Sequence, residues 1–81
     1  MNIRHCIKVD DFSKEEILNL FNLASDLKSK YRNKEEFKPF NNHSLAMIFA
    51  KPSARTRVSF ETGFSWMGGH AIYLAPQDIG L

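Results

Sequence analysis

The sequence lacks several features that would point to particular classes of protein. It has one cysteine, Cys6, which cannot form an internal disulfide and has no metal-ligand spacing around it. No apolar run reaches the length of about 18 residues that a membrane-spanning helix needs. Residues 1–5 have neither the apolar core of a secretion signal nor the composition of an organelle leader. These absences predict a reduced, cytoplasmic protein with no membrane span and no metal site, in which Cys6 is a small buried hydrophobe.

The sequence also lacks nucleotide-binding glycine motifs and has a small net charge. The four glycines form neither a Walker loop nor a dinucleotide-binding fingerprint. The 11 basic and 9 acidic residues leave a net charge of only +2, which argues against a general polyanion or nucleic-acid binder. Hydrophobic residues make up 43% and charged residues 25% of the chain, an ordinary globular composition. Its 81 residues have room for one small core at most.

Local patterns predict a helix over residues 13–31. Ser13 and Glu16 have the spacing of a capping box at its start. Apolar residues then recur every three or four positions, which indicates an amphipathic helix whose stripe packs into a core. The stripe consists of Ile17, Leu20, Phe21, Ala24, Leu27 and Tyr31.

The second half of the chain predicts part of an α/β domain. Residues 45–50 form a continuous apolar run, typical of a strand buried on both faces of a parallel sheet. A helix over 55–67 should follow, closed by the glycines at 68 and 69, and then a strand over 70–74. The order helix, strand, helix, strand contains one βαβ crossover, and two strands are too few for a finished α/β domain.

The segment between that strand and helix carries the strongest functional signal. Residues 51–57 combine Lys51, Arg55 and Arg57 with hydroxyl side chains at Ser53 and Thr56. Ligands of open α/β sheets bind beyond the carboxyl ends of strands, and a helix N-terminus offers free amides and a positive dipole end. Cations in a first helical turn oppose that dipole, so structure alone would not select them. The pattern predicts a phosphate-binding turn.

A purely structural interpretation of the same residues stays open at this point. Ser53 would then be only an N-cap, and Arg55 a solvated surface residue. Arg57 and Glu61, spaced four apart on the helix, would form a surface ion pair. A nucleic-acid-binding helix that uses Lys51 and the two arginines is a further alternative, which the balanced charge disfavours.

The segment from Phe49 to Glu61, FAKPSARTRVSFE, resembles the carbamoyl-phosphate signature of the aspartate/ornithine carbamoyltransferases. That family usually has Ser-Thr-Arg-Thr-Arg, whereas this chain has Ala54 at the second position. The stretch over 68–74 and the opening segment over 10–13 resemble the ornithine branch more than the aspartate branch. The resemblance covers nearly the whole chain.

The resemblance implies roles for individual residues. Ser53, Arg55 and Thr56 would contact carbamoyl phosphate, Ala54 would contribute its backbone amide, and Arg55 would act in catalysis by stabilising developing negative charge. Arg57 would be a partner of Glu61 or a further contact. The family also carries a glutamine that reaches a neighbouring subunit's site. The ungapped alignment places Gly80 there, and Gln77 would replace it only if the loop shifts.

For the whole protein, the resemblance implies a transferase of amino-acid metabolism. It would move the carbamoyl group of carbamoyl phosphate to the side-chain amine of ornithine, in arginine biosynthesis, as a cytoplasmic homotrimer without a metal or organic cofactor. Residues 1–81 would be part of the carbamoyl-phosphate-binding domain, with the amino-acid-binding domain absent, and would not act alone. The alternative is a noncatalytic, truncated paralogue that binds phosphate or joins a full-length subunit.

Overall fold

The structure is a computed structural model and describes residues 4–80. The predicted absence of a leader rests on residues 1–5, and residues 1–3 lie outside the described range. The chain divides into two compact units, Met1–Lys34 and Glu35–Leu81, which are described separately. Within residues 4–80, no helix has the length and apolar character needed to cross a membrane.

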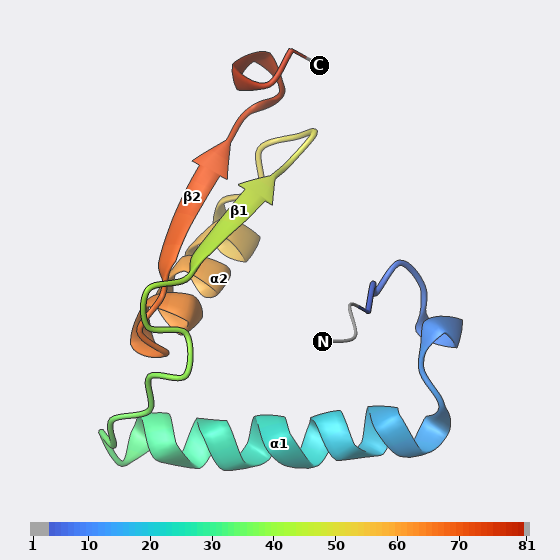
Figure 1. Ribbon diagram of the computed structural model, residues 1–81, viewed down its shortest axis with the longest axis vertical. Helices are drawn as coiled ribbons and strands as arrows, with labels where there is room; N and C mark the ends of the chain where they lie inside the picture. The colour runs from blue at the N-terminus through green and yellow to red at the C-terminus, as the bar shows by residue number, and fades with distance from the viewer. Residues whose placement is uncertain (1–3, 81) are drawn as a thin grey trace. The chain divides into compact units, whose positions relative to one another are not determined.

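The first unit holds a short 3-10 helix, η1 (Val9–Asp11), and the long helix α1 (Lys14–Arg32) (Figure 1). The predicted capping box is confirmed, because the Glu16 amide donates to Ser13 Oγ at 3.1 Å and the Ser13 amide donates to Glu16 Oε1 at 2.9 Å. The guanidinium of Arg4 pairs with the Glu16 carboxylate and lies 4.6 Å from the centre of the Phe12 ring. The Arg4 hydrogen bond, followed by the Ser13 amide, lowers the pKa of Glu16 from 4.5 to about 2.

Two predictions about burial in this unit are wrong. Cys6 is exposed rather than buried. No residue of α1 is buried, and on its apolar stripe Phe21 is 66% and Tyr31 51% exposed. The physical reason is size: this unit contains one long helix and a short preceding segment, which offer too little apolar surface to cover the stripe.

The second unit is a βαβ arrangement followed by a turn (Figure 1). Its elements are β1 (Ser44–Ile48), α2 (Ala54–Trp66), β2 (His70–Leu74) and the 3-10 helix η2 (Pro76–Asp78). The two strands pair in parallel, with Met47 opposite Tyr73 and Ile48 opposite Leu74. The predicted parallel pairing is therefore confirmed, although β1 ends at Ile48 instead of continuing to residue 50.

Burial of β1 on both faces is also wrong. Met47 is the one buried hydrophobic residue among those described, at 5% exposure, whereas its neighbour Ile48 is 51% exposed. Successive side chains of a strand point to opposite faces. Helix α2 lies along one face of the sheet, and no helix or strand within residues 35–80 covers the other face (Figure 1).

The end of α2 has the predicted glycine cap. The Gly68 amide donates to Ser65 O at 3.0 Å and the Gly69 amide to Phe64 O at 2.9 Å, the two bonds of a Schellman motif. Gly68 has a φ of +88°, a conformation that side-chain-bearing residues rarely adopt. This cap turns the chain directly into β2, which lets β2 run parallel to β1.

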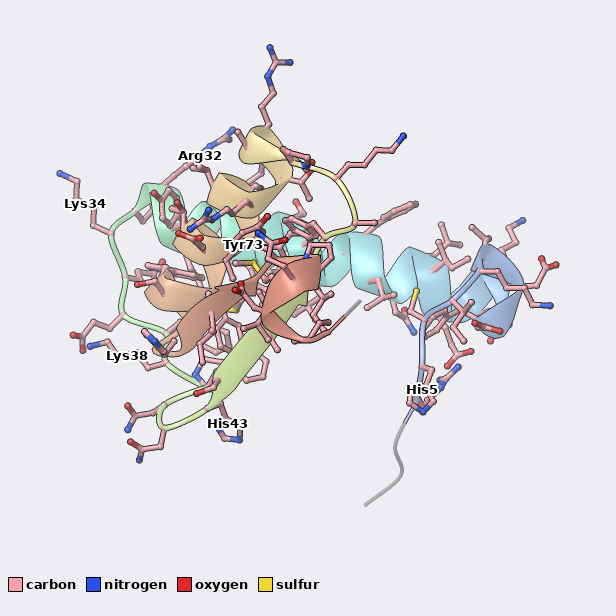
Figure 2. The ribbon with its side chains drawn as sticks, turned by 90° about the horizontal axis from the view of Figure 1, so that it is seen from above. His5, Arg32, Lys34, Lys38, His43 and Tyr73 are labelled. Carbon is pink, nitrogen blue, oxygen red and sulfur yellow. The ribbon has the colours of Figure 1, made fainter. Side chains whose placement is uncertain are left out.

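The connection before β1 is held by aromatic rings. The Phe37 ring lies 6.0 Å from the Trp66 ring, and the Phe40 ring stacks on Phe64 at 5.0 Å between centres. Figure 2 shows Lys38 and His43 at the margin of the unit, with Tyr73 among its elements. These contacts hold the entry to β1 against the C-terminal half of α2.

Candidate anion-binding site

The start of α2 leaves hydrogen-bond donors available. The first intrahelical bond runs from the Arg57 amide to Ser53 O at 2.9 Å, so the amides of residues 54–56 have no acceptor within the helix. Ser53 occupies the N-cap position with φ −148° and ψ 74°, but its side chain makes no capping hydrogen bond. Ser53 therefore does not act as the simple side-chain cap that the structural interpretation requires, in contrast to Ser13 on α1.

The charges at the two helix starts are opposite in sign. The first turn of α1 carries Glu15 and Glu16, which complement the positive end of the helix dipole. The first turn of α2 carries no acid, and Arg55 and Arg57 lie at its start instead. These cations add to the positive dipole end, so the arrangement favours an external anion.

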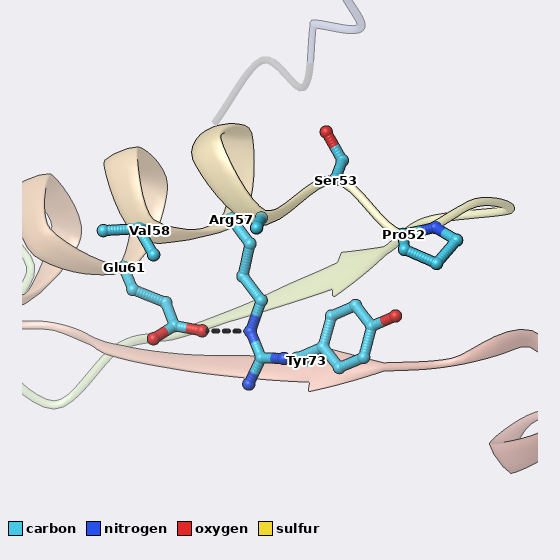
Figure 3. A pocket seen from close by; sticks show the side chains of 7 residues that line it. Pro52, Ser53, Arg57, Val58, Glu61 and Tyr73 are labelled. Atoms are coloured by element: carbon cyan, nitrogen blue, oxygen red, sulfur yellow. Dashed lines mark hydrogen bonds and ion pairs between the residues drawn. The ribbon is translucent and has the colours of Figure 1, made fainter.

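A hollow of about 380 Å³ lies beside this helix start (Figure 3). Its walls come from the segment after β1, from the first two turns of α2 and from β2. They are formed by Pro52, Ser53, Ala54, Arg57, Val58, Glu61 and Tyr73. The hollow thus lies at the carboxyl end of the strands, where ligands of open α/β sheets bind.

Arg57 is held from two sides within this hollow. Its Nε donates to Glu61 Oε1 at 2.7 Å, which confirms the predicted pair. Its guanidinium carbon lies 4.2 Å from the centre of the Tyr73 ring, a cation–π contact (Figure 3). The arginine fork is thereby fixed against β2, in a hollow that it shares with Ser53.

Arg55 lies on a different side of the helix. It lines a second hollow of about 440 Å³, together with Ala54, Val58 and Ser59. Residues two apart on a helix point in nearly opposite directions, which separates Arg55 from Arg57. Ala54 and Val58 line both hollows.

The remaining predicted site residues lie apart from these hollows. Thr56 is exposed in the first turn of α2 and lines neither of the two. Gln77 is exposed within η2, after β2, and Gly80 has a φ of +80°. Among residues 4–80, no group of three histidine, cysteine or acidic side chains is arranged to hold a metal ion.

Tyr73 is the residue that sequence reasoning missed. Its ring packs against the guanidinium of Arg57 and lies 5.9 Å from the ring of Phe49. The predicted strands could have indicated this position. Parallel pairing of the two strands brings the end of the second strand beside the end of the first. Alternation along β2 then turns residue 73 toward α2.

A scan against protein-family models matches residues 4–81 to the description "Aspartate/ornithine carbamoyltransferase, carbamoyl-P binding domain". Among curated proteins, the chloroplastic ornithine carbamoyltransferase of Pisum sativum is 53% identical over 78 residues, covering 95% of this chain and 21% of the pea protein.

Solved structures give the same family. The ornithine carbamoyltransferase of Burkholderia thailandensis is 42% identical with a TM-score of 0.88, covering 90% of this chain and 25% of that one. The enzyme from Pyrococcus furiosus is 40% identical with a TM-score of 0.88, covering 93% and 24%. This chain thus spans between a fifth and a quarter of the length of these relatives.

Proposed function

The chain belongs to the aspartate/ornithine carbamoyltransferase family, and from that membership we propose that its α2 start binds carbamoyl phosphate within a longer ornithine carbamoyltransferase. The reaction would transfer the carbamoyl group to the side-chain amine of ornithine, giving citrulline and phosphate. The relatives' names support ornithine as the acceptor, since the pea, Burkholderia and Pyrococcus proteins are all named for it. They favour this enzymatic role over the noncatalytic alternative.

The observation that carries the proposal is the positive start of α2, whose first turn contains no acidic residue. Three features coincide there: first-turn amides without helical acceptors, a Ser53 hydroxyl not used for capping, and two arginines where a helix ordinarily prefers acids. Each opposes the stability of the isolated helix and suits a bound phosphate. A charge-assisted hydrogen bond contributes roughly 1.5–3 kcal/mol, so several acting together are enough for micromolar binding.

The proposed chemistry follows from the same donors. The ornithine amine attacks the carbonyl carbon of carbamoyl phosphate, the bond to the phosphate oxygen breaks, and the amine loses a proton. Negative charge grows on the carbonyl oxygen and on the departing phosphate. Arg55 and the amides at residues 54–56 are the proposed groups that stabilise this charge, with Ser53 and Thr56 orienting the substrate.

Several parts of the proposal extend beyond this chain. Residues 1–81 would be one part of a carbamoyl-phosphate-binding domain, the acceptor domain would lie elsewhere in the protein, and the whole would be a cytoplasmic homotrimer of arginine biosynthesis. A shifted loop would be needed for Gln77 to contact a neighbouring subunit in place of Gly80. The trimer is tested by sedimentation of the full-length protein, where a monomeric mass would contradict it.

The proposed function is tested by titrating carbamoyl phosphate into the full-length protein and by measuring citrulline formed from ornithine. Arg55→Ala should weaken binding by roughly 10²-fold, as expected for loss of a bidentate charge-assisted contact. Lys14→Ala is the matched control, because it removes a cation from the start of α1 that lines neither of the two hollows. Equal affinities for the two variants would refute the assignment of the site.

A further inference from the structure

Both ends of the proposed phosphate-binding segment converge on one aromatic ring. The anion loop, defined here as residues 49–57, begins directly after β1 and ends in the first turn of α2. Tyr73 contacts Phe49 at its beginning, with ring centres 5.9 Å apart, and Arg57 at its end, 4.2 Å from the ring centre. We infer that Tyr73 is a positioning residue that fixes the anion loop for substrate, an inference that rests on the proposed function.

The position of Tyr73 suits this role because Tyr73 lies on β2, a strand that is paired with β1. Tyr73 is paired in register with Met47, the buried residue of β1, near the carboxyl ends of both strands. Its backbone is therefore held by the sheet, while its ring reaches toward the loop and α2 (Figure 3). The loop itself has no regular secondary structure over residues 49–53.

The start of α2 has few other means of being held. No residue of α2 is buried, and the apolar residues near its start are largely exposed, with Val58 at 59% and Phe60 at 56%. Burial of apolar surface therefore contributes little to fixing the first turn. The contact between Arg57 and the Tyr73 ring links the start of α2 to the sheet through side chains.

Because Arg57 is charged, its contact with the Tyr73 ring is electrostatic as well as apolar. A cation in a first helical turn is unfavourable on its own, and here it is balanced by the Glu61 carboxylate and by the negative face of the ring. The ring thus holds a guanidinium in the hollow that contains Ser53. Loss of the ring would leave Arg57 held only by Glu61 and would remove the ring contact at the beginning of the loop. A displacement of about 1 Å at a reacting group can cost 10²-fold in rate.

The test measures steady-state kinetics of the full-length protein with Tyr73→Leu. This change keeps an apolar side chain on β2 but removes the π face. We expect the KM for carbamoyl phosphate to rise about fivefold, the equivalent of one exposed cation–π contact, while the KM for ornithine stays within about twofold. Tyr73→Phe, which keeps the ring face, should recover most of the lost affinity.

Arg4→Ala is the matched control for stability alone. It removes a cation–π contact to Phe12, the kind of contact that Tyr73→Leu removes, together with an ion pair to Glu16, in the first unit of the chain. It should lower the melting temperature and leave the KM for carbamoyl phosphate unchanged. The inference is overturned if Tyr73→Leu lowers the melting temperature without raising that KM, or if Tyr73→Phe raises it as much as Tyr73→Leu.

These outcomes separate the inference from the function on which it rests. If the wild-type protein binds carbamoyl phosphate and Arg55→Ala abolishes binding, but Tyr73→Leu has no effect on KM, the positioning role alone fails. If the wild-type protein does not bind carbamoyl phosphate, the proposed function fails, and the positioning role fails with it.

Discussion

Arg57 donates from Nε to Oε1 of Glu61, one turn further along α2, at 2.7 Å. Both side chains are partly exposed, Arg57 at 45% and Glu61 at 38%, so water and salt screen the pair. A spacing of four on a helix is the geometry in which such pairs form, and it is typically worth a few tenths of a kcal/mol. The pair therefore orients Arg57 more than it stabilises the fold.

A double-mutant cycle on this pair should give a small coupling. Removing Arg57 and Glu61 singly and together by alanine substitution is expected to yield a coupling of about 0.3–0.5 kcal/mol in the free energy of unfolding, and less in 1 M salt. Urea unfolding of the four proteins measures it. A coupling above about 2 kcal/mol that is insensitive to salt would show that the pair holds the fold together.

The two serine N-caps should behave differently on substitution. Ser13→Ala removes a capping hydrogen bond that the structure shows, so the free energy of unfolding should fall by about 1 kcal/mol. Ser53→Ala removes a hydroxyl that makes no capping bond, so the loss should stay below about 0.5 kcal/mol. Carbamoyl-phosphate affinity should show the reverse order, with a loss of about fivefold or more only for Ser53→Ala. Equal effects of both changes on stability would contradict this assignment.

Gly63 and Gly69, both near the end of α2, should respond to alanine substitution in opposite directions. Gly63 lies inside the helix with nothing within 4 Å of an added Cβ, so Gly63→Ala should stabilise the protein by about 0.5–1 kcal/mol. An added Cβ at Gly69 would clash with the ring of Phe64, which is stacked on Phe40. Gly69→Ala should therefore destabilise by about 1–3 kcal/mol. Thermal unfolding compares the two, and a neutral Gly69→Ala would show that the ring stack yields easily.

The stability of the start of α1 should fall at acid pH, because Glu16 becomes protonated. Its pKa is about 2 when folded and 4.5 ordinarily, so the carboxylate stabilises the folded state at pH above about 4.5. That stabilisation should disappear as the pH falls from about 4.5 to about 2. Glu16→Gln does not titrate, so the melting-temperature difference between wild type and variant should shrink over this window. A difference that stays constant from pH 7 to pH 2 would contradict the assigned pKa.

Features specified by neighbouring residues were predictable from the sequence. The capping box at Ser13 and Glu16 and the glycine cap at Gly68 depend on side chains and dihedral angles within a few residues. The pair of Arg57 with Glu61 follows from helical spacing alone. The βαβ order followed from the lengths of the apolar segments and the caps between them.

Features that depend on contacts distant in sequence were not predictable to the same degree. The role of Tyr73 arises from strand register, which brings it beside Phe49 and Arg57. Periodicity shows that α1 has an apolar face, but it does not show what covers that face. Helical spacing alone separates Arg55 from Arg57, but which of the two lies in the hollow beside Tyr73 depends on how α2 is rotated against the sheet, which no local pattern specifies.

We propose above that the start of α2 binds the phosphate of carbamoyl phosphate. A crystal structure of the full-length protein with carbamoyl phosphate, or with a stable mimic of it, tests this most directly. Phosphate oxygens should lie within hydrogen-bond distance of the amides at residues 54–56, with the guanidinium of Arg55 turned onto the ligand. A ligand bound elsewhere, with Arg55 directed into solvent and the α2 amides bonded only to water, would contradict it.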